Sequence, residues 1–155
     1  MSHQPFISPR DEIVNTMIDL GHLSRSHRIV IAGSGSVELY LALRRRGFVY
    51  PILTSSRRIR RGQCAAALIA GNLSFSAIET ALAQASGFLE AAANVAVSIE
   101  SQESGLTLKV RTKLQQLGFR IEAGARCREA FVLAAHRQDV GQGFGQNFGT
   151  MANVA

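Results

Sequence analysis

Apolar side chains recur along the chain in two alternating patterns. Between Pro9 and Gly21 the apolar side chains recur at helical spacing, which predicts an amphipathic opening helix over residues 9–20. An unbroken apolar run at 29–32 is typical of a strand that is buried on both faces. Helical spacing then returns over 37–46. The first third of the chain is therefore predicted to be helix, strand and helix.

The same alternation continues to residue 137. Ser74 or Ser76 is expected to cap a helix, and a further helix is predicted over 106–117. The short polar link between the last two strands favours an antiparallel pair. Pro51 favours an edge position for its strand. Further strands are predicted at 48–53, 64–70, 94–99, 119–123 and 130–135. This order predicts an α/β fold, an open and mostly parallel sheet with a C-terminal antiparallel strand and helices on both faces.

Length and composition fit one folded domain. The chain has 155 residues, of which 46% are hydrophobic and 18% charged. We expect residues 1–138 to form the domain and the Gly-, Gln- and Asn-rich residues 139–155 to be a disordered tail. No apolar run approaches the ~20 residues that span a bilayer, and residues 1–10 lack the pattern of a secretory signal, so a soluble cytoplasmic protein is expected. Cys64 and Cys127 are too few for a zinc cluster and are expected to be buried and reduced, with no metal bound.

Charge adds one asymmetry. The formal net charge is +6, and seven arginines fall between positions 44 and 61. Because a guanidinium forks onto phosphate and carboxylate, this stretch predicts contact with a phosphate-bearing ligand or with nucleic acid, or else a solvated cationic face. Any binding of nucleic acid through it should be electrostatic and strongly dependent on salt.

The segment Gly33-Ser34-Gly35-Ser36 links a buried strand directly to a helix. Backbone can approach a ligand closely at such a turn, with the first N–H groups of the helix pointing at it. A glycine turn is also good packing chemistry between strand and helix. Taken alone, it indicates a ligand site only weakly.

The wider arrangement resembles the class I S-adenosylmethionine-dependent methyltransferases over about residues 9 to 137. The resemblance rests on the glycine turn, on the later turn Gly71-Asn72-Leu73-Ser74-Phe75, and on the closing strands that begin at Phe119 and Ala130. It implies a sheet with one antiparallel strand and S-adenosylmethionine as cofactor. The positions that match the family's cofactor turn are Ala32, Gly33, Ser34, Gly35 and Ser36.

The chain departs from the family pattern at several positions. The family's acid before the glycine turn is Ile31 here, and its third glycine is Val37. The family also holds the ribose with a carboxylate after the second strand, whereas this chain has only the hydroxyls of Thr54 and Ser55 there. About ten residues separate the second and third strands, so a helix, a strand and an adenine-contacting loop are missing. The resemblance is therefore to a shortened and degenerate member.

Asn72 and Phe75 match, in kind, the family turn that accepts hydrogen bonds from a target amine and stacks on its ring. They fit equally well as a turn residue and a core residue at a helix entry. No general base is evident among the histidines, and His136 is expected at the surface. Positioning alone can support a methyl transfer, so a missing base does not exclude catalysis.

Two other functions remain open. Ser55, Ser56, Arg57 and Arg58 would suit the 2′-phosphate of NADP in a dinucleotide-binding fold. The absence of any Asp or Glu between Glu38 and Glu79 would instead suit a non-catalytic binding or assembly module. The sheet edge near 49–53, exposed by the missing strand, predicts a homodimer.

Overall fold

The computed structural model describes residues 7–56 and 59–137, which form one α/β unit around a single sheet. The elements follow one another as α1 (Pro9–Leu20), β1 (Arg28–Ala32), α2 (Ser36–Arg45), β2 (Tyr50–Leu53), β3 (Cys64–Ile69), α3 (Phe75–Ser86), β4 (Leu89–Ile99), α4 (Leu106–Gln116), β5 (Phe119–Arg126) and β6 (Phe131–Arg137).

The six strands of the described residues lie in the order β2-β1-β3-β4-β6-β5. β1 is parallel to β2 and β3, and β3 is parallel to β4. β6 runs antiparallel to both of its neighbours, β4 and β5. The predicted mostly parallel sheet with a C-terminal antiparallel strand is confirmed.

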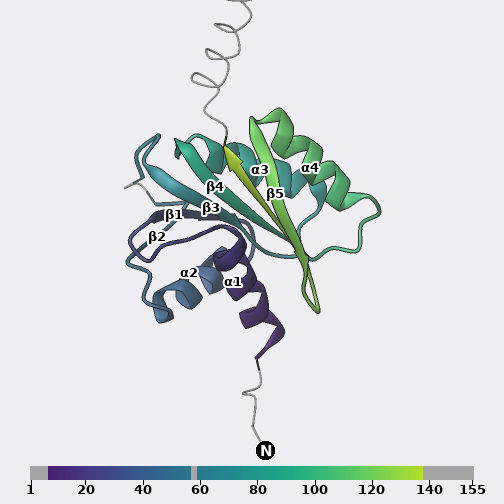
Figure 1. Ribbon diagram of the computed structural model, residues 1–155, viewed down its shortest axis with the longest axis horizontal. Coiled ribbons are helices and arrows are strands. Elements are labelled where there is room, and N and C mark those ends of the chain that lie inside the picture. Colours follow the sequence, from purple (N-terminus) through teal and green to yellow (C-terminus); the bar gives the residue numbers. More distant parts are fainter. Residues whose placement is uncertain (1–6, 57–58, 138–155) are drawn as a thin grey trace, which may run out of the picture.

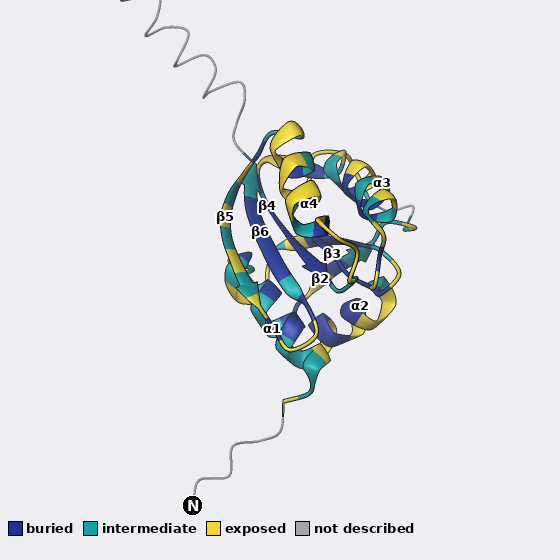
Figure 2. Cartoon of the chain, turned by 90° about the vertical axis from the view of Figure 1, so that its right-hand side faces the viewer, coloured by how far each residue is buried: buried dark blue, intermediate teal, exposed yellow. Residues whose placement is uncertain are grey.

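Helices cover both faces of the sheet: α1 and α2 lie on one face, and α3 and α4 on the other (Figure 1). Alternate residues of β1 serve the two cores, because Ile29 and Ile31 pack under α1 and α2 while Val30 packs under α3 and α4. Figure 2 shows the central strands as a buried layer between these helices. A strand buried on both faces has no polar positions, which is why its sequence is an unbroken apolar run.

Two strands are longer than their sequences indicate. β4 begins at Leu89 instead of residue 94, and β5 continues to Arg126 instead of residue 123. The added part of β4 has exposed residues at 90–92, and β5 alternates exposed and half-buried positions. Alanine and glycine on such half-exposed strands give little hydrophobic contrast, so the pattern missed them.

β2 is an edge strand, as Pro51 predicted, and residues 54–63 connect it to β3. The described parts of this connection, residues 54–56 and 59–63, contain no helix or strand. Both cysteines are buried and free. Within the described ranges, no helix is long and apolar enough to cross a membrane. The predicted tail at 139–155 lies outside the described residues.

Candidate functional site

The glycine turn lies where β1 ends and α2 begins. Gly33 has a positive φ of 102°, and Gly35 takes the N-cap position of α2 without a side-chain cap. The Gly35 N–H donates to the carbonyl of Ala70 at the end of β3 (3.1 Å). The two loops at the carboxyl ends of β1 and β3 are therefore joined through their backbones.

This contact explains two glycines by packing. A Cβ on Gly33 would lie 2.2 Å from the Ala70 carbonyl oxygen, and a Cβ on Gly71 would lie 2.2 Å from the Ser34 hydroxyl. Gly71 also has a positive φ, of 121°. No side chain fits at either position. The contact between the two loops therefore accounts for both glycines.

Glu100, directly after β4, is a site residue that the sequence analysis missed. Its Oε2 accepts the N–H of Gly71 (3.0 Å) and the hydroxyl of Ser98 (3.1 Å). Ser98 is fully buried, and the Glu100 side chain is only 13% exposed. The available signal was an acidic residue at the carboxyl end of a buried strand, where ligands of open α/β sheets bind.

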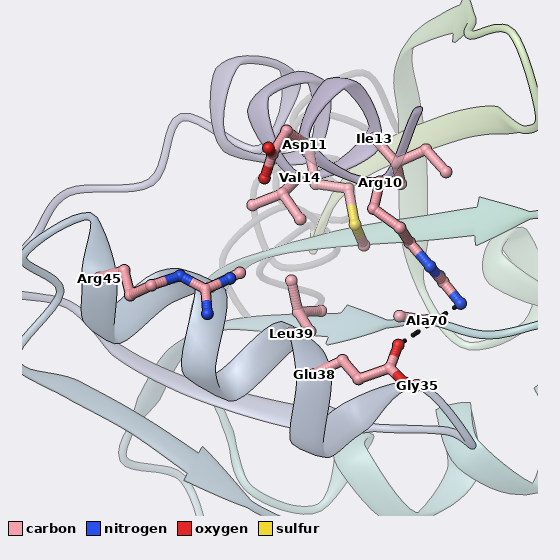
Figure 3. Close-up of a pocket in the computed structure, with 11 residues that line it drawn as sticks. Arg10, Asp11, Ile13, Val14, Gly35, Glu38, Leu39, Arg45 and Ala70 are labelled. Carbon is pink, nitrogen blue, oxygen red and sulfur yellow. Dashed lines mark ion pairs between the residues drawn. The ribbon is translucent and has the colours of Figure 1, made fainter. Parts of the chain in front are cut away.

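Arg10, from the first turn of α1, connects two acids over the glycine turn. Its guanidinium lies 3.4 Å from Glu100 Oε1 and 3.5 Å from Glu38 Oε2. Glu38 is in the first turn of α2, and its side chain is 72% exposed. Figure 3 shows Arg10 and Glu38 facing each other next to Gly35 and Ala70. One cation and two anions therefore stand together at this edge of the sheet.

A cavity of about 190 Å³ opens beneath this ion pair, between α1 and α2. Its floor is apolar and includes Val14, Met17 and Leu39. Asp11 and Arg45 complete its charged rim. A hydrogen bond from Arg46, with a second from Ser8, lowers the pKa of Asp11 below its usual value of 3.8. The cavity thus combines an apolar base with charges of both signs.

A second polar cavity, of about 170 Å³, lies at the same edge of the sheet beyond Glu100. Residues from the end of β4, the start of α4 and the β5–β6 turn line it, among them Glu103, Thr107 and Arg126. Glu100 belongs to this lining and also pairs with Arg10 of the first cavity. It therefore stands between the two cavities.

Thr54 and Ser55, the hydroxyl residues predicted to lie near a ribose, directly follow β2. The Thr54 N–H donates to the Ile31 carbonyl (3.2 Å), so β2 ends level with β1. Thr54 and Ser55 then line a separate shallow hollow with Gln84 and Phe88, near the carboxyl end of α3. They share no lining residue with the cavity under Arg10.

Asn72 and Phe75 lie in the turn after β3 and in the first turn of α3. Asn72 is exposed and follows Gly71, the residue whose N–H Glu100 accepts. Phe75 is half-buried and packs against the core under α3 and α4. Ser74 caps α3 by accepting the N–H of Ala77, which selects between the two predicted caps.

The described arginines of the 44–61 stretch make contacts with different parts of the domain. Arg46 turns toward α1, where it bonds to Asp11 and Asn15. Arg44 donates to the carbonyl of Val49. Arg57 and Arg58, the residues predicted for the NADP phosphate, lie outside the described residues.

Several solved structures share this fold. A 1,6-didemethyltoxoflavin-N1-methyltransferase of Burkholderia thailandensis, with bound S-adenosylhomocysteine, matches with a TM-score of 0.65 at 12% identity, over 85% of this chain and 79% of that one. A precorrin-6y C5,15-methyltransferase of Geobacter metallireducens matches with 0.58 at 10% identity, over 89% and 93%. An S-adenosylmethionine-dependent O-methyltransferase of Thermotoga maritima matches with 0.58 at 14% identity, over 89% and 68%.

No family model and no curated protein matches the chain. The fold is that of the class I methyltransferases, as the sequence pattern predicted. At such low identity the likeness is one of fold, and function has to be argued from the site.

Proposed function

We propose that this chain is a small S-adenosylmethionine-dependent methyltransferase of the cytoplasm that binds its cofactor mainly by the methionyl end. The observation that supports the proposal is the group of Arg10, Glu38 and Glu100 above the glycine turn. The methionyl end of the cofactor is a zwitterion, with one carboxylate and one ammonium group. A site for it needs a cation and an anion side by side, and this edge of the sheet offers both.

The donor set fits that end of the cofactor. The carboxylate of the cofactor would replace Glu38 as the ion-pair partner of Arg10, because the Glu38 side chain is exposed and can move away. The released Glu38 would then accept from the ammonium group. Glu100 is tied to Gly71 and Ser98, so it would stay in place and fix the position of Arg10. Ala32, Gly33, Ser34, Gly35 and Ser36 would form the backbone wall of the site.

The donor set does not fit the ribose equally well. An ionised acceptor forms hydrogen bonds roughly twice as strong as a neutral one, and the end of β2 has only hydroxyls. Thr54 and Ser55 also open into a different hollow. We therefore expect them to contribute little and the cofactor to bind with modest affinity.

The methyl acceptor would be a polar molecule bound in the cavity beyond Glu100, with Asn72, which follows Gly71, as a hydrogen-bond acceptor. S-adenosylmethionine supplies, when bound, a methyl group made electrophilic by its sulfonium charge. The chain's own part is to orient the acceptor and to take up its proton, for which Glu100 is suitably placed between the two cavities. Phe75 would support this wall from the core of the domain.

We also expect a homodimer through the β2 edge. β2 ends the sheet, and Val49, which directly precedes it, is 51% exposed. An unpaired strand edge with apolar neighbours favours pairing with a second copy. Light scattering at high protein concentration tests this, and a monomer at all concentrations would contradict it.

Calorimetric titration with S-adenosylmethionine, S-adenosylhomocysteine and NADPH tests the proposed function. We expect micromolar binding of both adenosyl compounds and none of NADPH. Binding of NADPH alone would favour the dinucleotide site instead. Binding of none of the three would leave a non-catalytic module, in which the ion pairs of Arg10 serve only to hold α1 against the sheet.

A further inference from the structure

A hollow of about 510 Å³ lies at the amino ends of the parallel strands, opposite the end where the glycine turn lies. Arg28, Tyr50 and Cys64 line it, and each is the first residue of its strand, in β1, β2 and β3. Because these strands are parallel, the hollow is at their amino ends. It is therefore separate from the site of the proposed function.

The larger part of the surface of the hollow is polar, and a smaller apolar area forms its floor. Ile52, Ile59 and the buried Cys64 provide the apolar surface. Tyr50, at the rim, is 49% exposed, so part of its ring is open to a ligand. A planar apolar group would find both a floor and an aromatic ring here. The volume lies within the range of ordinary small-molecule sites.

The guanidinium of Arg28 is held in a defined position. It lies 5.9 Å from the centre of the Tyr50 ring. It also donates to Gln63 Oε1 at 2.9 Å. A cation stacked near an aromatic ring and fixed by a hydrogen bond needs little rearrangement to meet a ligand.

Arg60 adds a second cation to the rim, and none of the described residues that line the hollow is a carboxylate. The sequence has no Asp or Glu between Glu38 and Glu79, the stretch that contains β2 and the following loop. The charge of Glu90, on β4, reaches Cys64, but Glu90 is not part of the lining. The field in the hollow is therefore positive and favours an anion.

We propose that this hollow binds single-stranded nucleic acid, with one base against Tyr50 and the adjoining phosphates on Arg28 and Arg60. Stacking on an aromatic side chain and positive charge along the backbone are the two elements of single-strand recognition. A base inside a duplex is stacked between its neighbours and does not enter such a hollow. The ligand is thus an unpaired strand.

Fluorescence anisotropy of the full chain with a labelled single-stranded RNA of mixed sequence, about twelve nucleotides long, tests the proposal. Tyr50→Ala should weaken binding about tenfold, the loss of one stacked base, whereas Tyr50→Phe should stay within about twofold of the wild type. Arg60→Gln should weaken binding and reduce the dependence of log K on log salt by about 0.7.

Arg111→Gln is the matched control, because it removes one exposed arginine charge from α4 on a different part of the surface. It should leave the affinity nearly unchanged. All substituted side chains are largely exposed, and a thermal melt verifies that each variant folds. Arg28→Gln provides a second probe of the rim.

Three results would overturn the proposal. One is equal weakening by Arg60→Gln and Arg111→Gln, which indicates a general charge effect. Another is wild-type affinity in Tyr50→Ala. The third is tight binding of adenosine monophosphate or of duplex RNA in place of the single strand. S-adenosylhomocysteine titrated into the same samples keeps this test separate from that of the proposed function, since Tyr50 and Arg60 lie far from Arg10.

Discussion

The carboxyl ends of β1 and β3 differ from the carboxyl end of β2. At β1 and β3, two glycine-containing loops contact each other through their backbones, and Glu100 fixes them from below. At β2, the chain offers no carboxylate and turns away toward α3. Under the proposed function, the packing of the two loops preserves the glycines of the methionyl half of the site, whereas packing requires no carboxylate after β2 for the ribose half.

The largest expected effect concerns the packing of the two loops. Gly33→Ala places a Cβ 2.2 Å from a backbone oxygen at a φ of 102°. We expect it to reduce the free energy of unfolding by more than about 3 kcal/mol. Urea denaturation provides the measurement.

Gly62→Ala is the matched control for this substitution. Gly62 also has a positive φ, of 75°, but among the described residues no atom beyond its two chain neighbours lies within 4 Å of the position of its Cβ. Only the backbone cost of about 1 kcal/mol is expected there. An equal decrease in the free energy of unfolding in Gly33→Ala and Gly62→Ala would show that the two loops are not in tight contact.

A smaller effect is expected at Glu100. Glu100→Ala leaves the buried hydroxyl of Ser98 and the N–H of Gly71 without their acceptor. A fully buried group left unsatisfied costs about 1–3 kcal/mol, and because both of these bonds are only part-buried the stability should fall by about 2–4 kcal/mol in total. Glu100→Gln retains an acceptor oxygen and should cost less.

Glu122→Ala serves as the comparison, since Glu122 forms an exposed ion pair with Arg120 at 3.1 Å. Its loss should change the stability by less than about 0.5 kcal/mol. Thermal unfolding of Glu100→Ala, Glu100→Gln and Glu122→Ala shows which variant loses the most stability. A loss at Glu122 as large as that at Glu100 would contradict the role assigned to Glu100.

The smallest effect concerns the pH dependence of the stability that the acidic residues of α1 contribute. Hydrogen bonds from the backbone and side chain of Arg128 lower the pKa of Glu12 below its usual value of 4.5, and Arg46 lowers that of Asp11. Because both pKa values are lower in the folded state, these contacts stabilise the fold above the unfolded values, and that contribution disappears as the pH falls through the folded values.

The double variant Asp11→Asn and Glu12→Gln should therefore be less stable than the wild type at pH 7. The difference should shrink steadily below about pH 4. Urea midpoints measured across this range test the sign. A difference that stays constant from pH 7 to pH 2 would show that ionisation of these two acids does not hold α1.

The sequence predicted the fold well because strands buried on both faces leave uninterrupted apolar runs, as at 29–32. It missed the start of β4, where exposed alanines give no contrast. It also missed Arg10, Glu38 and Glu100 as a group, since they come from three distant elements and meet only when α1 packs beside α2 and the end of β4. The glycine turn between β1 and α2 followed from the motif, but the place of Thr54 and Ser55 depended on the path of the loop after β2.

The most direct test of the central claim is the affinity of S-adenosylhomocysteine in Arg10→Gln, with Arg120→Gln as a control for the loss of one exposed positive charge. The account predicts that the wild type and the control bind alike in a calorimetric titration. It predicts that Arg10→Gln binds at least about tenfold more weakly, because a charge-assisted hydrogen bond is lost. Unchanged affinity in Arg10→Gln would contradict a methionyl site at this edge of the sheet.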